Sequence, residues 1–293
     1  MSVLSSVKGV QDIMQRHNLH ARKGLGQNFL IDQNILTRIA DSAEINKEEY
    51  VVEIGPGLGA LSRELADRGR GLLCIDIDER LETILEETLA GYENIRILFH
   101  DILKTDIESA LTDAFQVKEI ISYKVCANIP YNITTPIIFK LLESCPHLQS
   151  ATLMMQKEVA ERILADPGSK EYGRLTIATA YHAKVEHVIN VSRNCFYPRP
   201  EVDSTVLRFI PLQKKMLAPE EEIIFKKILN IFFQQRRKTI LNSLTNFFQI
   251  DKKIMEEKLQ IIDLAPNLRP ENLALQDYIT LVRAFSQIPH KFC

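Results

Sequence analysis

The sequence predicts an α/β fold with a mostly parallel sheet, followed by a small all-helical domain. Short runs of apolar, β-branched residues alternate with segments of helical periodicity over residues 50–155, and such alternation is typical of βαβ units around a parallel sheet. Residues 221–287 then show helical periodicity without a strand pattern. The chain of 293 residues is long enough for one large domain and one small one.

The spacing of apolar residues predicts the elements of the first domain. A helix is expected over residues 32–45, because Ile35, Leu36 and Ile39 recur at helical spacing. Two further helices are expected at 60–68 and 81–89. Buried strands are expected at five apolar runs: 50–54, 72–75, 95–99, 123–127 and 151–155.

The domain boundary is predicted near residue 210. Residues 194–200 are interpreted as a loop stiffened by two prolines, 204–210 as a strand, and 211–220 as a linker. We therefore predict a first domain at 1–210, in which residues 1–20 form a polar N-terminal extension with little pattern. A helical domain is predicted at 211–293.

Composition restricts the class of protein. A hydrophobic content of 45% and a charged content of 25% are ordinary for a globular chain. No stretch approaches the roughly 18 apolar residues of a membrane span, and the first twenty residues lack a secretory pattern. The five cysteines show no Cys-x-x-Cys spacing. We expect reduced thiols, no metal site, no membrane association and a cytoplasmic location.

Polar residues follow the predicted strands where a parallel sheet binds ligands. The glycines of residues 55–59 follow the first strand, where backbone can approach a ligand closely. Asp76 follows the second strand, 21 residues after Gly55, and a carboxylate there can bind ribose hydroxyls. These residues fit NAD and S-adenosylmethionine equally. Asp101, after the third strand, favours S-adenosylmethionine, since it can meet an adenine amine; the alternative is that both aspartates only cap helices.

Asn128, Ile129, Pro130 and Tyr131 follow the fourth strand and predict chemistry at a nucleobase amine. The amine lone pair is delocalised into the ring, so methylation requires acceptors that favour a tetrahedral nitrogen. The Asn128 side-chain oxygen and the Ile129 carbonyl can supply two, and Pro130 restricts the residue before it. Tyr131 can stack on the base. In isolation, a plain turn before a helix is the favoured interpretation, but the place of this segment after the fourth strand of a cofactor-binding sheet favours function.

Phe196 and Tyr197, in the proline-stiffened loop, are candidates to stack on the opposite face of a flipped base. Aromatic packing between domains is the alternative. The formal net charge of −2 is unusual for a nucleic-acid-binding protein, but binding requires a local positive field and not a positive total.

With these residues in view, the chain resembles the KsgA-type (RsmA) ribosomal RNA adenine N6-dimethyltransferases. The matching segments span most of the chain: residues 23–30, 53–59, 76, 101, 128–131, 156–160, 172–175, 196–204 and 235–239. The resemblance implies a Rossmann-like class I S-adenosylmethionine-dependent methyltransferase domain with a seven-stranded sheet. One departure is Asp76, where bacterial members often carry Glu.

The resemblance also implies roles for individual residues. It implies cofactor contacts from Gln27, Asn28, Leu30, Gly55, Gly57, Asp76, Asp101 and Asn128, and a catalytic set of Asn128, Ile129, Pro130, Tyr131 and Phe196. The implied reaction is dimethylation of two adjacent adenosines in the 3′-terminal hairpin of small-subunit (16S) ribosomal RNA, late in assembly. The implied partner is the pre-small-subunit particle, and a monomer is expected.

Basic residues supply the candidate RNA contacts: Arg22, Lys23, Arg236, Arg237 and Lys238. The last three follow Phe232 and Phe233 on an expected helix, whose apolar side can face inward while the cations meet phosphate. A solvated helix face is the alternative.

Two other functions fit the same motifs. An Erm-type methyltransferase acts on an adenine of large-subunit RNA and confers macrolide resistance, and it shares the Gln-Asn-Phe-Leu and Asn-Ile-Pro-Tyr elements. The run of residues 196–204 favours the KsgA type. A non-catalytic RNA-binding assembly factor on the same fold is the other alternative, against which the intact residues 128–131 argue.

Overall fold

The structure is a computed structural model that describes residues 3–119, 122–235 and 237–286. The chain divides into two compact units. Within the described residues, the first unit comprises 3–160 and 183–211, and the second comprises 161–182 and 212–286.

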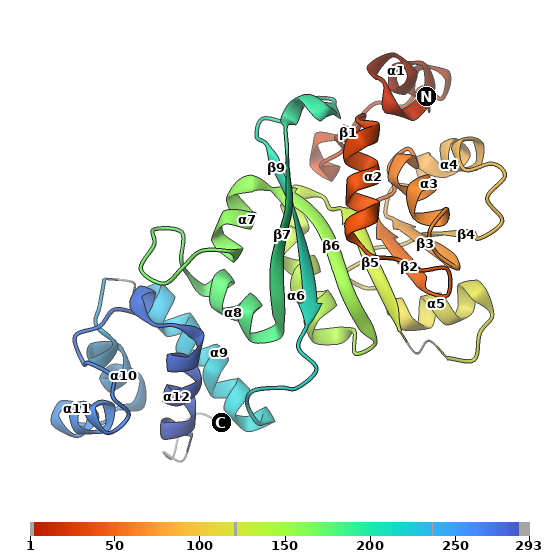
Figure 1. Ribbon diagram of the computed structural model, residues 1–293. Coiled ribbons are helices and arrows are strands. Elements are labelled where there is room, and N and C mark those ends of the chain that lie inside the picture. Colours follow the sequence, from red (N-terminus) through yellow and green to blue (C-terminus); the bar gives the residue numbers. More distant parts are fainter. Residues whose placement is uncertain (1–2, 120–121, 236, 287–293) are drawn as a thin grey trace. The chain divides into compact units, whose positions relative to one another are not determined.

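A seven-stranded sheet forms the centre of the first unit (Figure 1), in the order β4-β3-β2-β5-β6-β9-β7. Its strands are β2 (Tyr50–Ile54), β3 (Gly71–Asp76), β4 (Ile95–Phe99), β5 (Tyr123–Asn128), β6 (Leu148–Gln156), β7 (Ala183–Val191) and β9 (Ser204–Pro211). Only β9 runs against the others, since it pairs antiparallel with both β6 and β7. The predicted mostly parallel sheet is confirmed.

The strand order places a ligand site at the carboxyl end of β2. The chain leaves β2 toward β3 and β4 on one side, and β5 pairs with β2 on the other. Crossovers that diverge in this way leave a crevice outside the strand ends, where open α/β sheets bind ligands.

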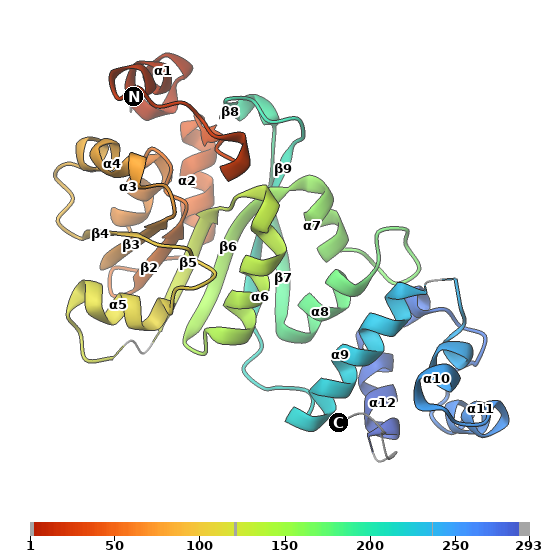
Figure 2. The same ribbon diagram turned by 180° about the vertical axis from the view of Figure 1, so that it is seen from behind.

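Helices cover both faces of the sheet, with α2 in front of it in Figure 1 and α6 in front in Figure 2. The helices that begin in this unit are α1 (Val7–Arg16), α2 (Gln33–Ser42), α3 (Ala60–Ala66), α4 (Glu82–Thr88), α5 (Ile107–Phe115), α6 (Thr134–Ser144) and α7 (Lys157–Ile163). Side-chain caps begin several of them: the Asp32 carboxylate accepts hydrogen bonds from the first turn of α2, and Asp106 does so for α5.

Short elements complete the chain. The 3₁₀ helices are η1 (Val3–Ser5), η2 (Lys23–Leu25), η3 (Glu79–Leu81), η4 (Tyr131–Ile133), η5 (Arg193–Cys195) and η6 (Pro270–Asn272). A separate two-stranded ribbon joins β1 (Phe29–Leu30) to β8 (Phe196–Tyr197). The loop predicted at 194–200 therefore contains a short strand.

The N-terminal residues are more than the polar extension that the sequence predicts. Within 3–20, α1 forms, and Leu4, Val10, Ile13 and Leu19 are buried in the main core of the unit. The prediction failed because the few apolar residues of this segment are separated by polar ones. Two residues at i and i+3 are enough to pack a short helix against a larger domain but too few to show a clear period.

The second unit is helical and has its own core. Its helices are α8 (Arg174–His182), α9 (Pro219–Gln234), α10 (Ile240–Phe248), α11 (Lys252–Ile261) and α12 (Leu275–Phe285). The aromatic rings of Phe225, Phe232, Tyr278 and Phe285 are almost fully buried in that core.

Residues 161–182 belong to this second unit, whereas the predicted boundary assigned them to the first domain. The Tyr181 ring lies 4.5 Å from that of Phe225, and the Tyr172 hydroxyl donates to the Leu273 carbonyl over 2.6 Å. The segment leaves the sheet after β6 and returns at β7. A boundary drawn at one point along the chain cannot describe such an excursion.

Candidate active site

A cavity opens at the carboxyl ends of β2, β3, β4 and β5 in the first unit. All eight residues predicted to bind the cofactor line it: Gln27, Asn28, Leu30, Gly55, Gly57, Asp76, Asp101 and Asn128. Pro130 lines it as well. Segments far apart in the sequence thus meet in one place, because parallel strands present their carboxyl ends at the same edge.

The glycine turn after β2 has a conformation that requires glycine. Gly55, Gly57 and Gly59 have positive φ angles of 72°, 56° and 86°. A Cβ atom on Gly57 would lie 3.0 Å from Cδ1 of Phe29. Phe29 therefore packs directly against the turn, and a side chain at position 57 would separate the N-terminal motif from the glycine loop.

Buried carboxylates give the cavity its electrostatic character. Burial raises the pKa of Glu53 to about 7, and the Cys74 thiol lies 3.5 Å from its carboxylate. Burial also raises the pKa of Asp76 to about 6, against the opposing effect of a hydrogen bond from the Asp78 backbone N–H. Asp101, at the end of β4, accepts a hydrogen bond from the Leu103 N–H over 3.0 Å.

This carboxylate set fits S-adenosylmethionine better than a dinucleotide. The described residues that line the cavity include Glu53, Asp76 and Asp101 but no lysine or arginine. Such a lining suits a ligand with sulfonium and ammonium charges and with ribose hydroxyl donors, whereas a pyrophosphate would face uncompensated carboxylates. The ambiguity that the sequence left between the two cofactors is thereby reduced.

The N-terminal motif is bound to β8 and to the Asn128 side chain. Strand β1 pairs with β8, with Phe29 opposite Tyr197 and Leu30 opposite Phe196. The Asn128 Nδ2 atom donates to the Asn28 carbonyl over 3.2 Å. Because its nitrogen has this partner, the amide directs its Oδ1 atom elsewhere as an acceptor.

The backbone beside Asn128 is also fixed. The Ile129 N–H donates to the Met154 carbonyl of β6 over 3.2 Å, which orients this peptide. The Tyr131 hydroxyl lies 2.7 Å from the Ser204 Oγ atom, so its half-buried ring is held in place. Of this segment, Asn128 and Pro130 line the cavity, whereas the described lining includes neither the 1% exposed Ile129 nor Tyr131.

Phe196 and Tyr197 lie on β8 and pair with the cavity-lining Leu30 and Phe29, but the described lining includes neither of them. The Phe196 side chain is only 2% exposed and packs in the main core, while the Tyr197 hydroxyl accepts a hydrogen bond from the Gln11 amide over 3.1 Å. Stacking of Phe196 on a base stays a prediction, and it requires this packing to open.

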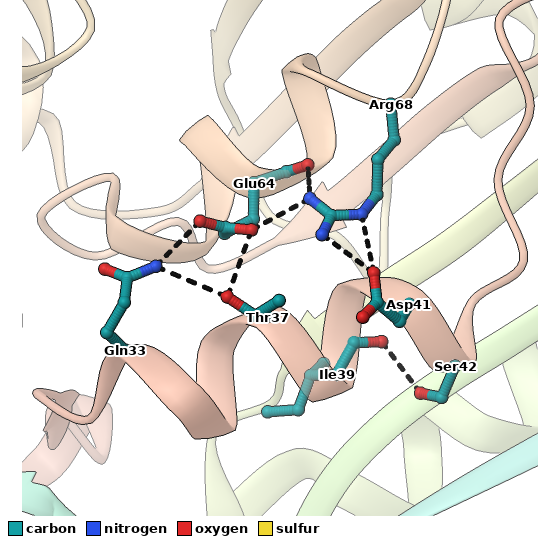
Figure 3. Close-up of polar contacts among 7 residues, drawn as sticks. All are labelled: Gln33, Thr37, Ile39, Asp41, Ser42, Glu64 and Arg68. Atoms are coloured by element: carbon teal, nitrogen blue, oxygen red, sulfur yellow. Dashed lines mark hydrogen bonds and ion pairs between the residues drawn. The ribbon is translucent and has the colours of Figure 1, made fainter.

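A polar network joins the helices that follow the two cofactor motifs (Figure 3). Helix α2 begins after the N-terminal motif, and α3 begins after the glycine turn. Glu64 of α3 accepts hydrogen bonds from Gln33 over 2.7 Å and from Arg68 over 2.8 Å, and Arg68 pairs with Asp41 of α2 over 2.8 Å. The sequence showed only polar residues on helices, and nothing in their spacing pointed to this network.

The candidate RNA-binding residues lie in two separate segments. Arg22 is exposed in the segment before the cavity, and Lys23 begins η2. Arg237 and Lys238 are exposed in the second unit, in the turn between α9 and α10, and Arg236 lies outside the described residues. The predicted helical placement is wrong: α9 ends at Gln234, and Thr239 caps α10. Phe232 is buried within α9, as expected.

The fold and the cavity define a class I S-adenosylmethionine-dependent methyltransferase. The glycine turn, Asp76 at the end of β3, Asp101 after β4 and Asn128 at the end of β5 meet in one cavity beside the switch point of the sheet.

Comparison with known proteins gives the family. The family described as ribosomal RNA adenine dimethylase matches residues 18–285, and the chain belongs to it. Ribosomal RNA small subunit methyltransferase A of Bacillus thuringiensis (strain Al Hakam) is 41% identical over 287 residues, which cover 97% of this chain and 98% of that protein. The protein of the same name from Bacillus mycoides (strain KBAB4) is 41% identical over 294 residues, 99% of both chains.

Solved structures agree. A dimethyladenosine transferase from Plasmodium falciparum has a TM-score of 0.74 and 32% identity, covering 88% of this chain and 97% of its own. The 23S rRNA methyltransferase ErmE has a TM-score of 0.69 and 28% identity, and the match covers 89% of this chain and 100% of that one. The protein is therefore an enzyme with S-adenosylmethionine as its cofactor, as the sequence predicted.

Proposed function

We propose that this enzyme transfers two methyl groups to the N6 amine of each of two adjacent adenosines in the 3′-terminal hairpin of small-subunit ribosomal RNA. The observation that carries the proposal is the position of Asn128. It lines the carboxylate-rich cavity, and its amide nitrogen is engaged by Asn28. The amide oxygen is then available as an acceptor beside the Ile129 carbonyl.

The two acceptors would act on the adenine amine. Bound S-adenosylmethionine would supply the methyl group: the new N–CH3 bond forms as the S–CH3 bond of the sulfonium breaks, and the bonding electrons stay with the neutral thioether that leaves. The Asn128 Oδ1 atom and the Ile129 carbonyl accept the two amine hydrogens, which favours a tetrahedral nitrogen with a localised lone pair. These hydrogen bonds strengthen as positive charge develops on nitrogen, so they lower the barrier instead of only tightening binding. The released proton can pass to water, so no dedicated general base is needed.

The remaining residues would hold the base. Tyr131, fixed through Ser204, offers an aromatic face on which a flipped adenine can stack. After the first transfer the amine keeps one hydrogen, so only one acceptor has a donor during the second transfer. The same site can therefore carry out both steps.

Sequence identity to the relatives favours small-subunit RNA over large-subunit RNA as the substrate. The small-subunit methyltransferases match at 41% identity over almost the whole chain, whereas ErmE matches at 28%. We propose that the substrate is the pre-small-subunit particle late in assembly and that the enzyme acts as a monomer. Within the described ranges no helix is long and apolar enough to cross a membrane, and the proposed site of action is the cytoplasm.

The test uses small and large ribosomal subunits from a strain that lacks the gene. Purified protein and S-adenosylmethionine with a labelled methyl group should label small-subunit RNA alone, and nucleoside mass spectrometry should detect N6,N6-dimethyladenosine. Label in large-subunit RNA would instead support the Erm-type activity. Tight particle binding without transfer would support a non-catalytic assembly factor. The Asn128→Ala variant serves as the matched inactive control.

A further inference from the structure

One buried carboxylate joins the N-terminal motif to the strand that carries Asp76. Asp78 is 4% exposed and lies two residues after β3. Its Oδ2 atom accepts a hydrogen bond from the Gln27 Nε2 atom over 2.7 Å. Its two oxygens also accept from Arg80, over 2.8 Å from Nε and 2.6 Å from Nη2. A buried charge with this many donors is well compensated, and the Arg80 hydrogen bond lowers the pKa of Asp78.

The same residue also contacts the predicted ribose-binding carboxylate. The Asp78 backbone N–H donates to the Asp76 Oδ1 atom over 2.9 Å. Asp78 therefore joins Gln27 to Asp76 through two hydrogen bonds. Both partners line the cavity, whereas Asp78 is absent from its described lining.

Gln27 has its side chain occupied by this arrangement. Its Oε1 atom accepts from the Arg22 N–H over 2.9 Å, while its Nε2 atom binds Asp78. Arg80 reaches the same segment, with Nη1 at 3.5 Å from the His20 carbonyl. The side chain of Gln27 thus connects residues 20–28 to the end of β3, which is a different role from direct contact with the cofactor.

We propose that Asp78 is a positioning residue for cofactor binding, which holds residues 20–28 and the Asp76 carboxylate in the geometry that S-adenosylmethionine requires. The proposal rests on the proposed function only in that the cavity binds this cofactor. Asp78 acts through Gln27 and Asp76, so its loss should weaken cofactor binding and leave the chemical step intact.

The experiment exchanges the donor and the acceptor of the Gln27–Asp78 pair. Gln27→Glu places two carboxylates against each other and should weaken S-adenosylmethionine binding about tenfold, the effect expected when a hydrogen bond to a charged group is removed. Asp78→Asn should weaken it by a similar factor. Combining both substitutions restores one donor and one acceptor between positions 27 and 78, but Arg80 Nη2, which also donates to Asp78 Oδ2 over 2.6 Å, loses that acceptor, so affinity should recover in part.

Calorimetry gives the dissociation constants for S-adenosylmethionine. Steady-state assays give kcat at saturating cofactor and the KM for small ribosomal subunits. We expect Asp78→Asn to weaken S-adenosylmethionine binding while kcat at saturating cofactor and that KM stay near wild type. Glu79→Gln, which removes the exposed neighbouring carboxylate, controls for charge. Because Asp78→Asn can fail to fold, melting temperatures are recorded without cofactor. As a second test, the S-adenosylmethionine affinities of Gln27→Glu and Gln27→Ala are compared. A larger loss of affinity in Gln27→Glu than in Gln27→Ala supports the proposal, and equal losses of affinity contradict it.

Binding measurements on the wild-type protein separate a failure of the positioning role of Asp78 from a failure of the proposed function. If wild-type protein binds S-adenosylmethionine and the single variants bind it equally well, or if the losses add in the combined variant, Asp78 is not a positioning residue. If the wild-type protein itself does not bind S-adenosylmethionine, the proposed function and this inference both fall.

Discussion

The cofactor cavity and the basic turn between α9 and α10 are built in opposite ways. The cavity depends on contacts between distant parts of the chain, such as Asn128 with Asn28, 100 residues apart. The turn depends on local contacts: the Lys238 N–H donates to the Gln235 carbonyl over 2.9 Å, and Thr239 caps the next helix. Its described cations, Arg237 and Lys238, are exposed.

This difference separates two kinds of function. Catalysis requires acceptors placed to a fraction of an ångström, which rigid strands and tertiary contacts can provide. Phosphate binding requires positive charge at roughly the right place, which an exposed turn can provide. Substitutions in the cavity should therefore change turnover or stability, whereas substitutions in the turn should change only RNA affinity and its dependence on salt.

The largest effect is expected for Asn128→Ala. The variant loses an acceptor that acts most strongly in the transition state, so kcat should fall by about 10² or more. Its affinity for S-adenosylmethionine should change far less. Rapid-quench measurement of methyl transfer, with calorimetric binding in parallel, separates the two quantities. Asn34→Ala, at an exposed site on α2, is the matched control, and equal turnover by Asn128→Ala and wild type would contradict the mechanism.

The next effect concerns the basic turn. Arg236→Ala with Arg237→Ala should weaken RNA binding and lower the slope of log affinity against log salt by about 2, one for each phosphate that the variant no longer neutralises. Filter binding of the 3′-terminal hairpin over a salt series measures this slope. Lys252→Ala with Lys253→Ala removes two exposed cations from α11 as a control. An unchanged slope in the arginine variant would remove these residues from the interface.

The sequence was sufficient to predict six of the seven sheet strands and the cavity, because both follow from short-range patterns, but it did not predict β7. Strand runs such as 50–54 and 95–99 match β2 and β4 residue for residue. Once the strands are parallel, residues just beyond their carboxyl ends must come together. The positions of Gly55, Asp76, Asp101 and Asn128 could therefore be predicted without knowing any contact.

The rest depends on contacts that have no sequence period. Helix α1 carries too few apolar residues to show one, and the core burial of Leu4 and Val10 appears only in the fold. The same holds for the Asp78 hydrogen bonds and for the end of α9 at Gln234, where no proline or glycine marks the stop. Phe196 was recognised in its motif, but no pattern predicted its burial.

A smaller effect is expected for Gly57→Ala, which tests whether the glycine turn and the N-terminal motif are a single packed unit. The positive φ alone costs about 1–2 kcal/mol for an L residue, and the new Cβ atom would contact the Phe29 ring. We expect a lower free energy of unfolding and weaker cofactor binding, both measured on the same preparation. Gly91→Ala has a positive φ but open space around the Cβ atom, so it measures the backbone strain alone. If the two variants lose the same stability and Gly57→Ala binds cofactor normally, the close packing with Phe29 is unimportant.

The smallest effect is expected for Asp76→Asn without cofactor, where the sign of the pH dependence is informative. Burial raises the pKa of Asp76 from 3.8 to about 6, so between these values the folded protein binds a proton that the unfolded chain has released. Stability from this group is therefore lost as pH rises through that window. Asp76→Asn should flatten this part of the curve and raise the melting temperature at pH 7.5 by about 2–4 °C, while weakening cofactor binding.

Melting temperatures from pH 4 to pH 8 test this expectation. The buried Glu53, whose pKa is raised to about 7, should keep its own decline in stability in the Asp76→Asn variant. Asp113→Asn, on the exposed side of α5, controls for the loss of one negative charge, and the flattening should be confined to Asp76→Asn. A variant less stable than wild type at pH 7.5 would mean that the Asp76 carboxylate supports the fold itself. That result would contradict the expectation that the buried Asp76 carboxylate lowers the stability of the folded protein and serves cofactor binding. The contrast between the buried carboxylates of the cavity and the exposed cations of the turn would then fail.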